Sequence, residues 1–153
     1  MSLSEWHSAG WLRPHQTTRQ QLADLFGIVD RDLEDADRGL SADWKFGISY
    51  NAVLKLCTVL LYAEGYRPEK TLAHYRTLQA LPLILGKEWQ HDADYLDACR
   101  TKRNVAEYDS AGRVSTTEAK ELLAFAKKLR PAVVAWLERQ HPTLSPWKPP
   151  AQV

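Results

Sequence analysis

The chain has 153 residues, of which 44% are hydrophobic and 25% are charged, which is enough for one domain with a sizeable core. Its formal net charge of +1 at pH 7 excludes a general nucleic-acid or membrane-surface coat but leaves room for a small local site for RNA or a nucleotide. We expect a cytoplasmic protein without a membrane role, because no signal peptide is visible and the longest apolar run is far below the roughly 18 residues that span a bilayer.

The two ends of the chain lack helical periodicity. Residues 1–16 contain Trp6, Trp11 and Pro14, and this composition predicts an extended N-terminal arm that is packed by its two tryptophans. Residues 142–153 contain four prolines, which predict an extended Pro-rich C-terminal tail. Residues 17–141 between them predict a single helical domain.

The first two expected helices have different faces. Residues 17–38 carry one apolar stripe and an opposite charged face, with Thr17 as the candidate N-cap. Residues 42–64, beginning at Ser41 or Asp43, are apolar almost all round. A helix of that kind is typical of the buried centre of a bundle.

Three further helices are expected over residues 69–85, 92–108 and 116–140. Pro82 should break or kink the end of the first of these. The second is the most polar in the chain. The third begins with Ser115 followed by Glu118, a capping-box pattern, and Pro131 should bend it without ending it. The pattern predicts an all-α, four- to five-helix up-and-down bundle with extended N- and C-terminal arms and no sheet.

Cysteine and histidine spacing gives no sign of a metal or redox site. Cys57 and Cys99 do not form a C-x-x-C pair, so we expect buried free thiols. No two of the five histidines pair at helical spacing, and no glycine-rich phosphate loop or nucleophile motif is present. We therefore expect no cofactor and no metal.

The stretch RNVAEYD, residues 103–109, is the strongest candidate for a site. Arg100 and Arg103 are three residues apart and share a helix face. Arginine offers a rigid fork of donors suited to phosphate, and Asn104 adds a neutral donor and acceptor. The alternative is a surface ion pair between Arg103 and Glu107, worth at most about 0.5 kcal/mol.

Three stretches carry a resemblance to the HEPN-domain family of small helical bundles: residues 49–67, residues 71–78 and residues 103–108. The likeness covers roughly residues 20–140. The family's hallmark is an arginine, a polar residue and, several residues later, a histidine. In active members this motif implies a metal-independent endoribonuclease site, usually at a dimer interface. Many members are toxins paired with a nucleotidyltransferase-type antitoxin.

The motif matches this chain in part. Arg103 stands for the arginine and Asn104 for the polar residue, while Tyr108, four residues after Asn104, falls where the histidine should be. Histidine transfers protons near neutral pH because its pKa is about 6.5, whereas tyrosine has a pKa of about 10. The resemblance therefore implies a degenerate, weakly active or inactive site at Arg103, Asn104 and Tyr108, with Arg100, Arg103 and Asn104 as binding residues.

The expected function is a degenerate RNA-binding, toxin-type module that works as a homodimer. The six tryptophans, with Trp147 on a tail that has little core to join, also favour a dimer. The alternatives are an active metal-independent endoribonuclease toxin and a purely structural protein-interaction bundle. A nucleotidyltransferase-type antitoxin is the expected partner, and Tyr108 is a speculative acceptor of nucleotide transfer. For His74, a partly buried helix residue with one hydrogen bond is preferred over a catalytic role.

Overall fold

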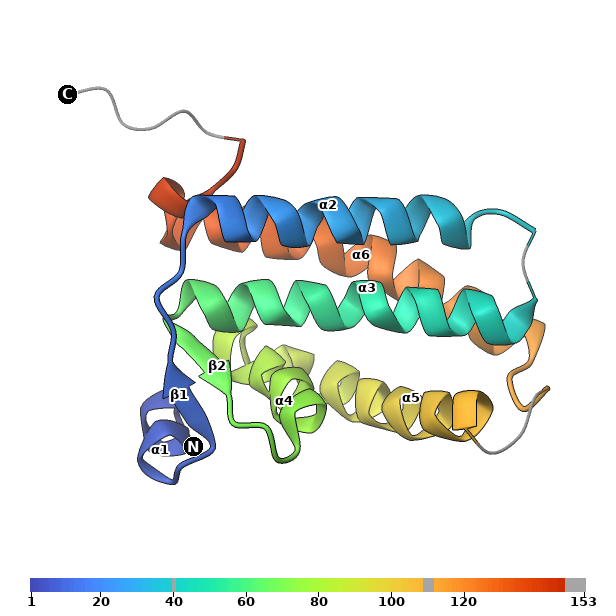
Figure 1. Cartoon of the computed structure of the whole chain (residues 1–153), viewed down its shortest axis with the longest axis horizontal. Helices are drawn as coiled ribbons and strands as arrows, with labels where there is room; N and C mark the ends of the chain where they lie inside the picture. Colours follow the sequence, from blue (N-terminus) through green and yellow to red (C-terminus); the bar gives the residue numbers. More distant parts are fainter. Residues whose placement is uncertain (40, 109–111, 148–153) are drawn as a thin grey trace.

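The computed structural model describes residues 1–39, 41–108 and 112–147, with the backbone alone for residues 105–108. Six helices dominate these residues (Figure 1). They are α1 (Leu3–Ser8), α2 (Arg19–Ala36), α3 (Ala42–Ala63), α4 (Ala73–Leu85), α5 (Gln90–Tyr108) and α6 (Thr116–Gln140). The short elements are strands β1 (Leu12–Pro14) and β2 (Tyr66–Pro68) and the 3-10 turns η1 (Lys87–Trp89) and η2 (Pro142–Leu144). The all-α bundle is confirmed.

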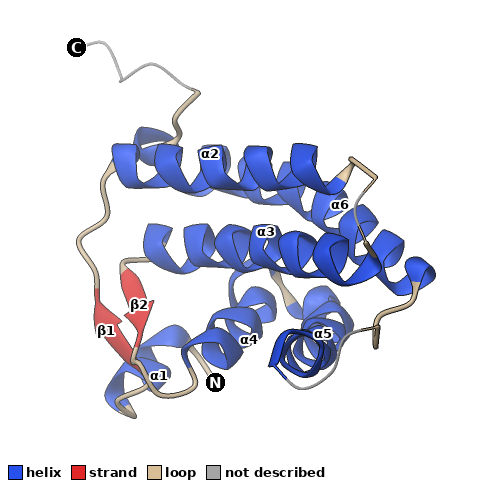
Figure 2. Ribbon diagram, turned by 45° about the vertical axis from the view of Figure 1, so that its right-hand side comes forward, coloured by secondary structure: helices blue, strands red, loops and turns tan. Residues whose placement is uncertain are grey.

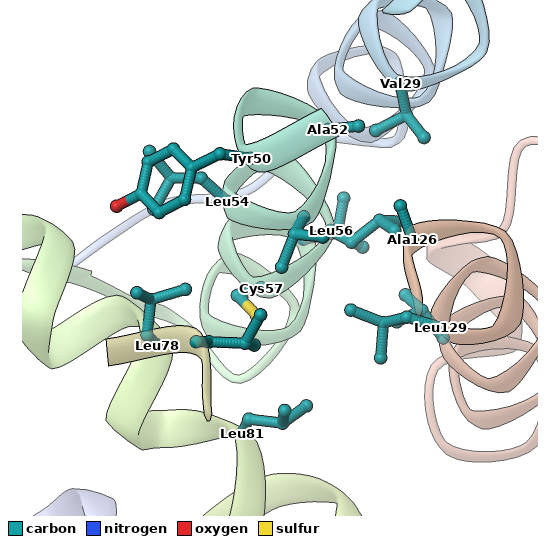
Figure 3. Packing of buried hydrophobic residues seen from close by; sticks show 14 of the residues in the cluster. Val29, Tyr50, Ala52, Leu54, Leu56, Cys57, Leu78, Leu81, Ala126 and Leu129 are labelled. Carbon is teal, nitrogen blue, oxygen red and sulfur yellow. The ribbon is translucent and has the colours of Figure 1, made fainter. Parts of the chain in front are cut away.

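Helix α3 lies at the centre of the bundle. It packs against α2, α4, α5 and α6, and Figures 1 and 2 show it running between the α2–α6 pair and the α4–α5 pair. Val53, Leu56 and Leu60 are fully buried, which confirms the prediction that this helix has no polar face of its own. Figure 3 shows Leu78 of α4 and Leu129 of α6 on opposite sides of it.

The same apolar character makes α3 the one helix among the described residues that is long and apolar enough to cross a membrane. In this fold 67% of the qualifying window is buried inside the bundle. The core helix of a bundle meets the same criterion, so length and composition alone are weak evidence for a membrane span.

The helix starts follow capping chemistry. The Ser115 hydroxyl accepts a hydrogen bond from the Glu118 N–H at 3.0 Å, and the Glu118 carboxylate accepts one from the Ser115 N–H at 3.0 Å, which confirms the predicted capping box. The prediction of Thr17 as a cap was wrong by one residue. Thr18 caps α2, and the Thr17 hydroxyl instead donates to the Tyr62 carbonyl oxygen at 2.6 Å.

The expectation of no sheet and of an extended N-terminal arm was wrong. Residues 3–8 form α1, and β1 pairs with β2 in a two-stranded antiparallel sheet that sets Arg13 opposite Arg67. Trp6 and Leu12 are buried and form a second, small core with Leu61. Strands of three residues are too short to carry an alternating pattern, and their partners lie more than fifty residues apart.

Two prolines lie inside helices. Pro131 lies within α6, which continues to Gln140 as predicted. Pro82 lies within the last turn of α4 without breaking it, and the helix ends three residues later at Leu85, which is the predicted end. Pro82 is itself buried, and packing against the core offsets the hydrogen bond that its missing N–H removes.

The beginning of the C-terminal tail is packed onto the bundle. Residues 142–144 form the turn η2, and the Arg19 guanidinium donates to the Ser145 carbonyl oxygen at 2.8 Å. The Trp147 ring meets the Phe26 ring edge-on at a centroid distance of 4.6 Å. The prediction of a wholly extended tail was wrong, and Trp147 has an intramolecular partner.

Candidate functional site

The predicted binding arginines lie where α3, α4 and α5 meet. The Cζ atom of Arg103 is 5.2 Å from the centroid of the Tyr50 ring, which comes from α3. The Cζ atom of Arg100 is 5.7 Å from the Tyr75 ring of α4. Both arginines are half-buried. Their i, i+3 spacing places both on one face of α5, as the sequence predicted, and this face lies at the junction.

Apolar anchors hold the three helices in this arrangement. Leu96 and Cys99 of α5 are buried in the main core, and Arg100 directly follows the second anchor. Leu78 of α4 is fully buried one helical turn after His74. The core contacts thus leave the polar residues at the edge of the α3–α4–α5 junction. We call Tyr50, Lys55, His74, Arg100 and Arg103 the cationic seam.

The structure places the residues of the predicted motif in different surroundings. Arg100 donates from Nε to the Asp97 carboxylate at 2.9 Å, so this arginine is oriented by an ion pair within α5. Asn104 is exposed one residue after Arg103. Tyr108 ends α5, and its side chain and that of Glu107 lie outside the described residues. The roles predicted for Tyr108, and the ion pair predicted between Arg103 and Glu107, stay predictions.

Tyr50 is a member of the seam that the motif does not include. Its side chain is only 1% exposed, and no described residue forms a hydrogen bond with its hydroxyl. Figure 3 shows the ring projecting from α3 with the hydroxyl at its far end. Burial raises the pKa of Tyr50 to about 12, while Arg103 and Arg100 act in the opposite direction. The phenol therefore keeps its proton and can donate a hydrogen bond at neutral pH.

His74 lies in the first turn of α4, with its ring centroid 6.4 Å from that of Tyr50. Partial desolvation lowers the pKa of His74, and the charges of Arg103, Lys55 and Arg100 lower it further, so the ring is neutral at pH 7. The ring is exposed, and no described residue forms a hydrogen bond with it. His74 is a helix residue, as expected, but the hydrogen bond expected for it was wrong.

The end of α4 beside His74 also favours an anion. Leu72 is its N-cap residue and provides no side-chain hydrogen bond to the first turn. The N-terminus of a helix carries a partial positive charge and unpaired N–H groups. The seam and this helix end together present positive charge and hydrogen-bond donors, which is the chemistry that binds phosphate or carboxylate.

The cysteines offer no second reactive site. Burial raises the pKa of Cys57 to about 12 and that of Cys99 to about 11, so both thiols are protonated and weakly nucleophilic. Cys99 borders a small cavity of about 110 Å³ between α3, α5 and α6 that the Lys102–Glu118 ion pair lines. Within residues 1–39, 41–108 and 112–147, no group of three or more His, Cys, Asp or Glu side chains is placed to hold a metal ion.

The sequence pattern identified the two arginines as candidate binding residues but did not identify Tyr50 and His74 as their neighbours. Tyr50 and His74 lie in stretches that were singled out for their family resemblance, yet nothing in the spacing of these residues links them to Arg103. Their proximity depends on how three helices pack. Comparisons with protein-family models, curated proteins and solved structures found no match to this chain. The function is therefore argued from the geometry of the seam.

Proposed function

We propose that the protein is a HEPN-like RNA-binding module of the cytoplasm, with weak or no ribonuclease activity. The observation that carries the proposal is the convergence of Arg100 and Arg103 with His74 and Tyr50 from two other helices. Guanidinium groups recognise phosphate through charge-assisted hydrogen bonds. Half-buried placement strengthens those bonds because nearby protein lowers the local dielectric constant.

Weak cleavage follows from the residue types. The sequence has tyrosine at position 108, where the family motif has histidine. General acid–base catalysis typically contributes about 10²–10⁴ in rate, so its loss leaves an RNA binder with little turnover. An active metal-independent endoribonuclease and a structural interaction bundle are the two alternatives that the experiments below separate.

The proposal includes a homodimer that brings two copies of residues 103–108 near one another and a nucleotidyltransferase-type partner in the cell. The family resemblance supports both. Trp44 is 67% exposed, and exposed aromatic residues are enriched at protein interfaces. Light scattering at high micromolar concentration is expected to give twice the chain mass. A monomer at that concentration contradicts the dimer.

RNA binding is tested by fluorescence anisotropy with Arg103→Ala and a matched control, Arg38→Ala. Both variants remove one arginine, but Arg38 is exposed near the end of α2, away from the seam. Arg103→Ala is expected to weaken binding by about 10- to 100-fold, since a hydrogen bond to a charged group contributes about 1.5–3 kcal/mol. Arg38→Ala should bind nearly as wild type. Equal losses in both variants would indicate non-specific charge attraction and contradict a site.

Cleavage is tested with the wild type, Arg103→Ala and Tyr108→His in the presence of EDTA. We expect little cleavage by the wild type and a gain in Tyr108→His. Strong wild-type cleavage that is lost in Arg103→Ala would establish the active endoribonuclease instead. If none of the three proteins binds RNA, the interaction bundle is the better description.

A further inference from the structure

The Tyr50 hydroxyl is a donor that lacks an acceptor. Its side chain is 1% exposed, and no hydrogen-bond partner lies among the described residues. A buried polar group without a partner destabilises the fold. Arg103 and His74 flank the ring that carries this hydroxyl, with the Arg103 Cζ atom 5.2 Å and the His74 ring centroid 6.4 Å from the Tyr50 ring centroid. A ligand oxygen atom next to the Tyr50 hydroxyl would accept the hydrogen bond that this hydroxyl can donate.

Three donor groups from three helices therefore lie around the Tyr50 ring. Tyr50 offers its hydroxyl, His74 a ring N–H and Arg103 its guanidinium fork. Lys55 adds a positive charge close enough to influence His74, and it has no ion-pair partner among the described residues. The uncapped N-terminus of α4 adds a further positive end.

We infer that the cationic seam binds a terminal phosphate monoester, as in a nucleoside monophosphate or a phosphorylated RNA end, through Tyr50, His74 and Arg103. A monoester presents three unesterified oxygens at one point, and these match three donors from three directions. An internal phosphodiester has only two such oxygens, and its chain must continue past the site on both sides. This inference rests on the proposed RNA binding and names the part of the RNA that the seam recognises.

Binding should be coupled to a proton on His74. The charged and titratable groups that face its ring are Tyr50 and Lys55 from α3 and Arg100 and Arg103 from α5, with Asp97 paired to Arg100. Desolvation lowers the pKa of the ring, and the three cations lower it further. A phosphate dianion, whose second pKa is about 6, offsets them and favours the imidazolium form. The ligand therefore raises the pKa of His74 when it binds.

The first test is an NMR titration of the His74 ring in the full chain with adenosine monophosphate and with adenosine. The monophosphate is expected to raise the pKa of His74, and adenosine, which has the same base and sugar, is expected to leave it unchanged. An unchanged His74 titration at saturating monophosphate overturns the inference. An equal response to adenosine overturns it as well, because the site would then recognise the nucleoside.

The second test removes single donors. Tyr50→Phe deletes only the hydroxyl and should weaken monophosphate binding about tenfold, as expected for one hydrogen bond worth about 1.4 kcal/mol. Tyr66→Phe is the matched control, because Tyr66 lies on β2 beside His7 and outside the seam. Wild-type affinity in Tyr50→Phe with an unchanged melting temperature would remove the hydroxyl from the site and overturn the three-donor geometry. His74→Gln should abolish the proton coupling.

The third test uses two RNA oligonucleotides that are identical except for a terminal phosphate. The phosphorylated one should bind about tenfold more tightly, and Tyr50→Phe should reduce that difference. Equal affinity for both overturns the inference and leaves the proposed RNA binding in place. If neither oligonucleotide binds but adenosine monophosphate still raises the pKa of His74, the proposed RNA binding is contradicted and the proposed phosphate site is supported.

Discussion

Leu72 adopts a backbone conformation that few side chains tolerate. Its φ of 56° and ψ of 32° lie in the left-handed region, and it is the one non-glycine residue with positive φ in the part of the chain that the structure describes. A branched side chain in that region costs roughly 1–2 kcal/mol. Leu72 is also 54% exposed, so burial of its side chain recovers little of this cost.

Leu72→Asn is therefore expected to stabilise the protein. Asparagine enters the left-handed region more readily than leucine, and the free energy of unfolding should rise by up to about 1 kcal/mol. Urea denaturation measures the change. Leu83→Asn is the control, because Leu83 is 38% exposed on the same helix with helical backbone, and it should lower stability. Equal losses in both variants would show that strain at Leu72 is negligible.

His74 should make stability depend on pH. Its pKa is lowered in the folded protein, so the unfolded chain binds more protons at mildly acidic pH. Stability is then fully present above the ordinary histidine pKa of about 6.5 and is lost as pH falls through the folded pKa. Urea denaturation in phosphate-free buffer between about pH 7 and pH 5 should show a smaller loss in His74→Gln than in the wild type. If the free energy of unfolding changes with pH equally in the two proteins, His74 does not contribute to the pH dependence.

At the scale of elements, α3 determines the stability of the bundle. It is the helix that contacts every other long helix, and its buried residues lie on all sides of it. Because neighbours surround it, a cavity in α3 cannot be closed by the movement of one helix alone. The loss of stability on truncating a side chain of α3 should therefore depend on how deeply that side chain is buried and less on its position along the helix.

Leu56→Ala tests this on the fully buried part of α3. We expect the free energy of unfolding to fall by about 2–5 kcal/mol, since a core leucine leaves both a transfer loss and a cavity. Trp44→Ala on the same helix removes a larger side chain that is 67% exposed and should cost less than about 1 kcal/mol. Chemical denaturation compares the two. A larger loss for Trp44→Ala would mean that the exposed end of α3 is covered in solution.

At the scale of the whole molecule, the N-terminal segment is attached to the bundle as a second layer. The β1–β2 pair joins it to the end of α3, and Trp6 and Leu12 cover Leu61 of α3 and Ala80 of α4. The Arg76 guanidinium of α4 stacks on the Trp11 ring, with Cζ 3.6 Å from the ring centroid. The segment thereby braces α4, the helix that carries His74.

Trp6→Ala should loosen this attachment. Trp6 is 7% exposed, and loss of a buried tryptophan typically costs about 3–5 kcal/mol. Trp147→Ala is the control at the other end of the chain, where the ring is 45% exposed and should contribute less. Hydrogen exchange should show faster exchange in β2 and the first turn of α4 for Trp6→Ala. Unchanged exchange there would mean that the segment does not brace α4.

The sequence by itself determined the helices and the centre of the bundle. The stripe on α2, the apolar character of α3 and the Ser115–Glu118 capping box are local patterns, and each corresponds to a local hydrogen-bond or burial requirement. The shared face of Arg100 and Arg103 is equally local, because it follows from the pitch of one helix. These features therefore needed no knowledge of long-range contacts.

Tertiary structure alone decided the rest. The β1–β2 pair and the small core that Leu12 forms with Leu61 depend on partners distant in sequence, whose packing outweighs weak local preferences. The seam depends on the same kind of contact. Tyr50 and His74 are 24 positions apart and are brought beside Arg103 by the packing of α3, α4 and α5, so no spacing in the chain could have revealed them.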